Sequence, residues 1–294
     1  MKGRNLSCAQ VVQVIDLLAQ NQCLFEAVII DTGAEPVNGL LDHQSRQADA
    51  LVKHLTDQHH ADLVAGVKEQ QAALRAMTPQ LYLQSVANFV LIEQLLRWAT
   101  FYYVQRFPAE LGHLSWVVDA KSEIGPTAWE KWWGRWLQPA LQSKFLVEPL
   151  GLIPGANYKF MNECFLRRKS DYEAALPGST DDPYALDAKG MTGDIRFNAG
   201  SEPGLELVDI LTNATRRSLL GHLEDEAAHD IRQLMLERGE QCITFIQLTK
   251  EGIDGREVPY RQRLLQFFAR GGLPALTSIT RRWINELDER GASG

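Results

Sequence analysis

Three aspartates are candidates for chemistry because of the segments in which they lie. Asp31 and Asp119 each follow a short apolar run typical of a strand, and Asp209 lies within an apolar helical segment. A carboxylate in such surroundings costs free energy to desolvate unless it is paired, hydrogen-bonded or bound to a metal. Mg²⁺ or Mn²⁺ would satisfy all three, because these cations prefer oxygen ligands. We therefore expect Asp119 and Asp209, with Asp31 as a third, to be metal ligands and catalytic residues for hydrolysis of a phosphodiester.

Each of these aspartates also has an ordinary structural interpretation. An aspartate that follows a strand is commonly a turn residue or a helix cap, which would account for Asp31 and Asp119. Asp209 could instead form an ion pair with Arg216 or with a neighbouring helix. Composition and spacing leave these alternatives open.

Lys121 extends the candidate site. With Asp119 it forms an Asp-x-Lys pattern, which is typical of restriction-endonuclease-like nucleases, and Asp31 could then be the upstream acid. The lysine would help to position the attacking water. We rank this alternative lower because it leaves Asp209 and its helix unexplained.

The chain is acidic overall, although its basic residues occur in short groups. Its 30 Lys and Arg residues against 37 Asp and Glu give a formal charge of −7, which argues against a histone-like positive coat. Arg216 and Arg217 follow Asp209 by two turns of the same helix, and we favour them as contacts to nucleic acid. They could equally be the cations that are common at helix C-termini.

The sequence motifs do not support several other classes of protein. The 4 cysteines are far apart and form no C-x-x-C pair. No Walker loop, G-x-G-x-x-G, G-x-S-x-G or H-E-x-x-H motif is present, so ATP, nicotinamide, serine-hydrolase and zinc-protease chemistry are unsupported. No secretory signal and no apolar run of about 18 residues occurs, so we expect a cytoplasmic protein without membrane spans.

Hydrophobic periodicity predicts an α/β chain, in the order α-β-long α-β-α-loop-β-α-α-β-α. A capping box at Ser7 to Gln10 opens the first helix. Residues 176–201 are expected to form a surface loop that contains a brief third strand. The strands are expected at 24–30, 113–118, 194–197 and 241–248. The later helices are expected at 42–107 with a break near Thr78-Pro79, at 127–138, 203–217 and 222–238, and in a last segment ending near Leu287.

One predicted helix carries four tryptophans on a single face. They are spaced at i, i+3, i+4 and i+7: Trp129, Trp132, Trp133 and Trp136. This spacing is what burial against a sheet requires, so we favour core packing. A surface for stacking bases or binding a partner is the alternative.

The region around Asp209 resembles a known family. The stretch from Asp194 to Leu211, which contains Ser-Glu-Pro-Gly-Leu-Glu-Leu-Val-Asp209, is similar to the closing "S..GLQLAD" motif of the uncharacterised family known as domain of unknown function 3800. Val117-Val118-Asp119 resembles that family's internal strand with its Asp, and Lys2-Gly3-Arg4 resembles its "ELKGR" stretch. The resemblance covers about Lys2 to Gly221, and it implies an RNase H-like mixed sheet and a metal-dependent nuclease role in mobile-element or defence settings.

The chain departs from that family at its beginning. The family opens with a strand ending in a "DES" motif, and Met1 stands where this element should already have passed. The resemblance thus implies that one metal-binding Asp, a nearby Glu and two or three strands are missing, which would leave the chain inactive. The alternative function is then a non-catalytic interaction or scaffold protein that uses the tryptophan helix and the loop at 176–201. An open sheet edge would also favour self-association.

We expect two regions along the chain. Residues 1–221 would form the RNase H-like domain with a helical insertion at 42–107, and residues 222–294 a C-terminal helical and strand extension packed on the same domain.

Overall fold

The computed structural model describes residues 6–57, 59–165, 186–238, 241–249, 259–269 and 271–291, without the side chains of residues 259, 261 and 285–291. The predicted motif at Lys2 to Arg4 and residues 176–185 of the predicted loop lie outside these ranges.

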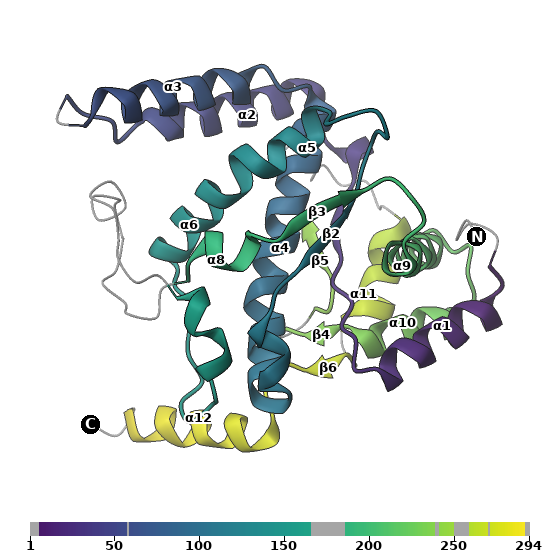
Figure 1. The fold of residues 1–294 in the computed structure, drawn as a ribbon. Coiled ribbons are helices and arrows are strands. Elements are labelled where there is room, and N and C mark those ends of the chain that lie inside the picture. Colours follow the sequence, from purple (N-terminus) through teal and green to yellow (C-terminus); the bar gives the residue numbers. More distant parts are fainter. Residues whose placement is uncertain are drawn as a thin grey trace.

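The described chain is a mixed α/β structure in which helices predominate (Figure 1). Its helices are α1 (Cys8–Gln20), α2 (Val37–Val52), α3 (Ala61–Arg75), α4 (Pro79–Arg106), α5 (Ala128–Trp132), α6 (Gln138–Val147), α8 (Ala188–Thr192), α9 (Pro203–Leu219), α10 (Asp225–Ile231), α11 (Pro259–Phe268) and α12 (Ser278–Gly291). Its strands are β1 (Val28–Ile30), β2 (Trp116–Asp119), β3 (Ile195–Asn198), β4 (Leu236–Glu237), β5 (Thr244–Ile246) and β6 (Leu273–Pro274).

The strands form three separate parallel pairs in the part of the chain that the structure describes. β1 pairs with β5, β2 with β3, and β4 with β6. The α/β class is therefore confirmed, whereas the single mixed sheet expected from the sequence is divided into short pairs. Parallel strands need long crossover connections, and here β1 and β5 are separated by most of the chain.

Local capping signals place several helices where the sequence predicts them. The Ser7 side chain accepts the N–H of Gln10 and begins α1. The Thr78 hydroxyl accepts the N–H of Leu81, and Pro79 occupies the first turn of α4, so the helical region breaks where expected. Between α5 and α6 the tryptophan helix continues through a π-helical turn at Trp133–Leu137.

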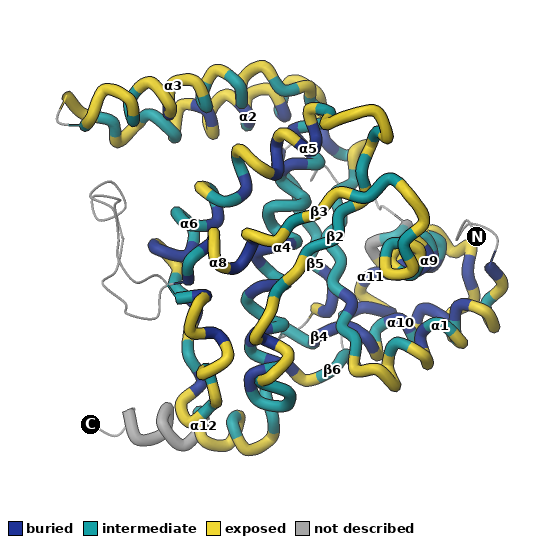
Figure 2. The backbone as a smooth tube through the Cα atoms, viewed as in Figure 1, coloured by how far each residue is buried: buried dark blue, intermediate teal, exposed yellow. Residues whose placement is uncertain are grey.

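Helix α4 runs through the middle of the molecule between two hydrophobic cores (Figure 1). The first core is formed by α1, α9, α10 and α11, and Ile231 is among its fully buried residues. The second lies between α4, α6 and the tryptophan helix, with Leu141 at its centre. Figure 2 shows that most buried residues follow these two groups of helices, whereas α2 and α3 are largely exposed or half-buried.

The tryptophans confirm the core-packing interpretation. Trp129, Trp132 and Trp133 are buried, and the rings of Trp129 and Trp132 stack with centroids 5.6 Å apart. Trp136 is half-buried beside them.

The C-terminal third differs most from the sequence prediction. The helix expected at 222–238 ends early, because Leu236 and Glu237 leave it to pair with β6. The single last helix is likewise wrong, since α11 and α12 are separate and β6 lies between them. Among the described residues, no helix has the length and apolar character needed to cross a bilayer.

Candidate functional site: a pocket between β1 and α9

The structure places Asp119 and Asp209 on two elements that touch. Asp119 is the last residue of β2, where it pairs in register with Asn198 of β3. Helix α9, which carries Asp209, contacts β2. Asp119, Lys121 and Asp209 are all exposed. The backbone N–H of Lys121 donates to Glu130 Oε1 at 2.7 Å, so this segment is anchored through its backbone.

The sequence predicts apolar surroundings for Asp209, and this prediction is wrong. The buried face of α9 consists of other residues, among them Ile210, Leu211 and Ala214. Asp209 lies towards solvent, and its Oδ1 accepts an N–H of Asn213 at 2.8 Å. Its neighbours in sequence are apolar, but Val208 next to it is also exposed. Desolvation therefore does not demand a metal at Asp209.

A three-acid metal centre is not formed within the described residues. No group of three or more His, Cys, Asp or Glu side chains lies there in a position to hold a metal ion. The residues present thus do not fit the Mg²⁺ or Mn²⁺ centre in which Asp31, Asp119 and Asp209 converge. The metal-binding and catalytic roles of these residues, and that of Lys121, stay predictions.

Two of the predicted site residues do come together in another place. Asp31 and Arg216 both line a pocket of about 570 Å³. One wall is the segment from Phe25 to Thr32, which contains β1. The opposite wall is one face of α9, and single residues of α4 and α11, Leu91 and Tyr260, complete the lining. The α9 residues in the lining recur at helical spacing: Val208, Thr212, Thr215, Arg216, Leu219 and Leu220.

The pocket runs along the edge of β1. All eight consecutive residues from Phe25 to Thr32 line it. Successive side chains of a strand point to opposite faces, so such a run can line one pocket only where the pocket follows the strand's edge. In the described structure β1 pairs with β5 alone. The pocket therefore follows an edge that no described strand covers.

Backbone geometry identifies the groups along that open edge. The N–H of Thr244 on β5 donates to the carbonyl of Ala27 at 3.2 Å, and the register pairs Ile29 with Phe245. Because backbone groups alternate in direction along a strand, Ala27 and Ile29 face β5, while Val28 and Ile30 face away from it. The three residues of β1 are half-buried rather than buried as expected.

Asp31 occupies the turn position that its alternative interpretation predicts. Its Oδ1 accepts the N–H of Gly33 at 2.9 Å and caps the short helical turn at Thr32–Ala34. Its Oδ2 accepts the hydroxyl of Tyr260 at 2.5 Å. Both carboxylate oxygens are thus hydrogen-bonded within the protein.

Glu26 is a charged pocket residue that the sequence did not identify. Its carboxylate forms an ion pair with Arg238 at 2.8 Å, and the two side chains are only 7% and 8% exposed, respectively. Burial raises the pKa of Glu26 to about 7, against the lowering effect of Arg238. The available sequence signal was a glutamate inside the apolar run at 24–30, because a charge in a strand-like run requires a partner.

The two arginines predicted to contact nucleic acid, Arg216 and Arg217, differ in burial and in hydrogen bonding. Arg217 is half-buried, and its Nη1 donates to the carbonyl of Leu6 at 2.8 Å, which fixes the chain before α1. Arg216 is exposed and lines the pocket, and its side chain has no hydrogen-bond or ion-pair partner among the described residues. Of the two arginines, Arg216 is therefore the one available to a ligand.

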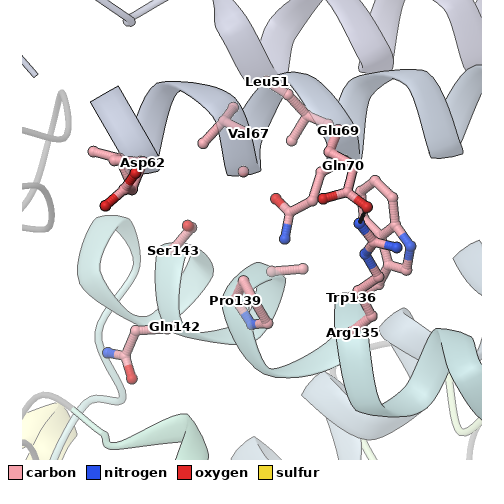
Figure 3. Close-up of a pocket in the computed structure, with 13 residues that line it drawn as sticks. Leu51, Asp62, Val67, Glu69, Gln70, Arg135, Trp136, Pro139, Gln142 and Ser143 are labelled. Atoms are coloured by element: carbon pink, nitrogen blue, oxygen red, sulfur yellow. Dashed lines mark ion pairs between the residues drawn. The ribbon is translucent and has the colours of Figure 1, made fainter. Parts of the chain in front are cut away.

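A second hollow, of about 690 Å³, lies between α3 and α6 (Figure 3). Arg135 and Glu69 form an ion pair at 2.6 Å across it, and Trp136 and Pro139 line it on the same side as Arg135. Its lining is largely apolar and contains none of the predicted site residues. We therefore take the pocket between β1 and α9 as the candidate site.

Comparison of the chain with protein-family models, with curated proteins and with solved structures finds no match. The similarity to the domain of unknown function 3800 therefore rests on the quoted motifs alone.

Proposed function

We propose that this protein is an interaction protein that binds an extended polypeptide segment along the open edge of β1. The observation that carries the proposal is that eight consecutive residues, from Phe25 to Thr32, line one pocket beside a strand that has a single partner among the described residues. Strand addition of this kind uses backbone hydrogen bonds for affinity and side-chain contacts for selectivity.

Two features of the pocket support this mode of binding. Val28 and Ile30 direct their backbone groups away from β5, so a bound segment would continue the ladder. Val208 of α9 and Leu220, which directly follows this helix, are 53% and 46% exposed on the opposite wall, where apolar side chains of the segment would cover them. Exposed apolar side chains that gather beside an open strand edge are typical of interaction sites.

Replacement of Val28 by proline tests the proposal. Proline removes the N–H that faces the pocket, and its ring obstructs an added strand, while the backbone bonds from Ala27 and Ile29 to β5 remain. We expect binding of a labelled seven-residue peptide of alternating valine and threonine to weaken about five- to tenfold, the effect of one lost hydrogen bond. Fluorescence anisotropy measures the change.

Val28→Thr is the matched control, because it keeps the N–H and the branched side chain. A second measurement does not depend on the folding of a variant: a peptide methylated at alternate backbone nitrogens should lose binding to the unaltered protein. Equal binding of the methylated and unmethylated peptides, or no binding of either, would refute strand addition.

A metal-dependent phosphodiesterase of RNase H-like type is a second candidate function. It is favoured by the contact between α9 and β2, which carry the exposed Asp209 and Asp119. Mg²⁺ is commonly held by one or two carboxylates together with substrate phosphates, so two acids on touching elements are a possible starting point. The nucleic acid, DNA or RNA, would then be the substrate.

Calorimetric titration with Mg²⁺ and Mn²⁺ tests this candidate. We expect metal-dependent heat from the unaltered protein and its loss in Asp209→Asn, with Asp42→Asn on α2 as a control at another exposed aspartate. The absence of heat, or heat that Asp209→Asn leaves unchanged, would exclude the phosphodiesterase without affecting the peptide-binding proposal.

A further inference from the structure

We infer that the segment bound along β1 carries an acidic side chain, which pairs with Arg216, between apolar side chains that cover α9. This inference rests on the proposed function and specifies the chemistry of the partner. Two observations support the inference. Two of the charged side chains in the pocket already have partners, and the third, Arg216, lies among the apolar residues of the α9 wall.

Three charged side chains line the pocket, and two of them are already neutralised or hydrogen-bonded. Glu26 is paired with Arg238, and Asp31 accepts hydrogen bonds from Tyr260 and Gly33. Arg216 has no such partner among the residues that the structure describes. A ligand that complements the pocket electrostatically must therefore supply a negative charge near Arg216.

The position of Arg216 favours an acidic side chain over a terminal carboxylate. Leu219 and Leu220 continue the α9 wall beyond Arg216, and Val208 and Thr212 precede it. Along α9, the cation therefore lies among the lining residues rather than beyond either end of them. A segment that fills the whole pocket passes Arg216 and presents a side chain to it.

The apolar part of the partner follows from the walls on both sides of Arg216. Val208 and Leu220 are the exposed apolar residues of the α9 face, and Leu91 of α4 completes the lining. Alternate side chains of an extended segment point to the same face, so one face can place apolar groups on either side of a central acid. Burial of apolar surface then supplies affinity, and the ion pair supplies selectivity.

A pair of peptides that differ at one position tests the inference. Both have seven residues, are capped at both ends and alternate valine with threonine; one has glutamate at its centre and the other glutamine. We expect the unaltered protein to bind the glutamate peptide about three- to tenfold more tightly, as a partly exposed ion pair allows. The preference should decrease as salt is added.

The matched protein variants are Arg216→Gln and Arg196→Gln. Arg216→Gln should abolish the preference for glutamate over glutamine, whereas Arg196→Gln, at an exposed arginine of β3 that does not line the pocket, should keep the preference. A further peptide, with a central glutamine and a free C-terminal carboxylate, distinguishes the two sources of charge. Tighter binding of that peptide than of the glutamate peptide would overturn the inference.

The inference and the proposed function fail in different ways. If both peptides bind equally and Arg216→Gln changes neither, strand binding stands and the acidic partner is excluded. If neither peptide binds, both are excluded.

Discussion

At the scale of single residues, burial and charge pairing have opposite effects on the pKa of Glu26, which lines the pocket. Its ion pair with Arg238 belongs to a polar group in which Arg238 also donates to Gln94 Oε1 at 2.8 Å, and Trp98 Nε1 donates to the same oxygen at 2.7 Å. These contacts join the beginning of β1 to α4. Such a buried pair costs desolvation free energy, so it is weak evidence for stability but holds the strand in one position.

Glu26 should make the stability of the protein depend on pH. Its pKa is raised to about 7 in the folded chain, so the folded state binds a proton more tightly than the unfolded state. The free energy of unfolding should therefore decrease as the pH rises from about 4.5 to above 7, by on the order of 2–3 kcal/mol. Urea unfolding at pH 5 and pH 8 measures this difference.

Glu26→Gln should remove most of that pH dependence, because glutamine does not titrate. The exposed Glu123→Gln is the control, and it should leave the pH dependence as it is in the unaltered protein. A pH dependence that persists in full in Glu26→Gln would assign it to other groups.

At the scale of elements, α4 packs in the second core and also contacts parts of the chain outside that core. Ile92, Leu96 and Val104 pack in the second core. Other side chains of the same helix make polar contacts with later parts of the chain: Tyr103 donates to the carbonyl of Gln22 at 2.9 Å, and Arg106 to that of Pro274 at 2.8 Å. Directional hydrogen bonds therefore join α4 to segments that lie outside the second core.

The helices were largely predictable from the sequence because their signals are local. Ser7 and Thr78 cap α1 and α4 as their neighbours in sequence indicate. The strand pairing was not predictable, because β1 and β5 meet across more than two hundred residues and β4 and β6 have two residues each. A two-residue strand has no periodicity to detect.

The candidate site was predictable only in part, for the same physical reason. Asp31 was predicted as a metal ligand and Arg216 as a contact to nucleic acid. Both line the pocket, Asp31 as a turn residue and Arg216 as a cation with no partner among the described residues. Asp209 was misjudged because apolar neighbours in sequence do not decide which face of a helix is buried. Glu26 was missed because its burial depends on Arg238, which lies far along the chain.

At the scale of the whole molecule, the pocket lies where the two cores approach each other. Phe25 and Leu219 line the pocket and belong to the first core, and the pocket also reaches Leu91 of α4, the helix that contributes to the second core. A segment bound along β1 would thus contact residues of the first core and helix α4, which contributes to the second core. Binding to the folded state alone stabilises the folded state by mass action.

The glutamate peptide should therefore raise the unfolding temperature of the entire chain. At a free concentration one hundred times its dissociation constant, the stabilisation is about 2.7 kcal/mol. For 294 residues, with an unfolding entropy of about 2.1 cal/mol/K per residue, this corresponds to a rise of about 4 °C. Scanning calorimetry measures it, with Val28→Pro as the comparison: its five- to tenfold weaker binding should reduce the rise to about 2–3 °C at the same peptide concentration. A single transition that moves as a whole indicates that the two cores unfold together, whereas a shift confined to one of two transitions would show that the peptide stabilises one core only.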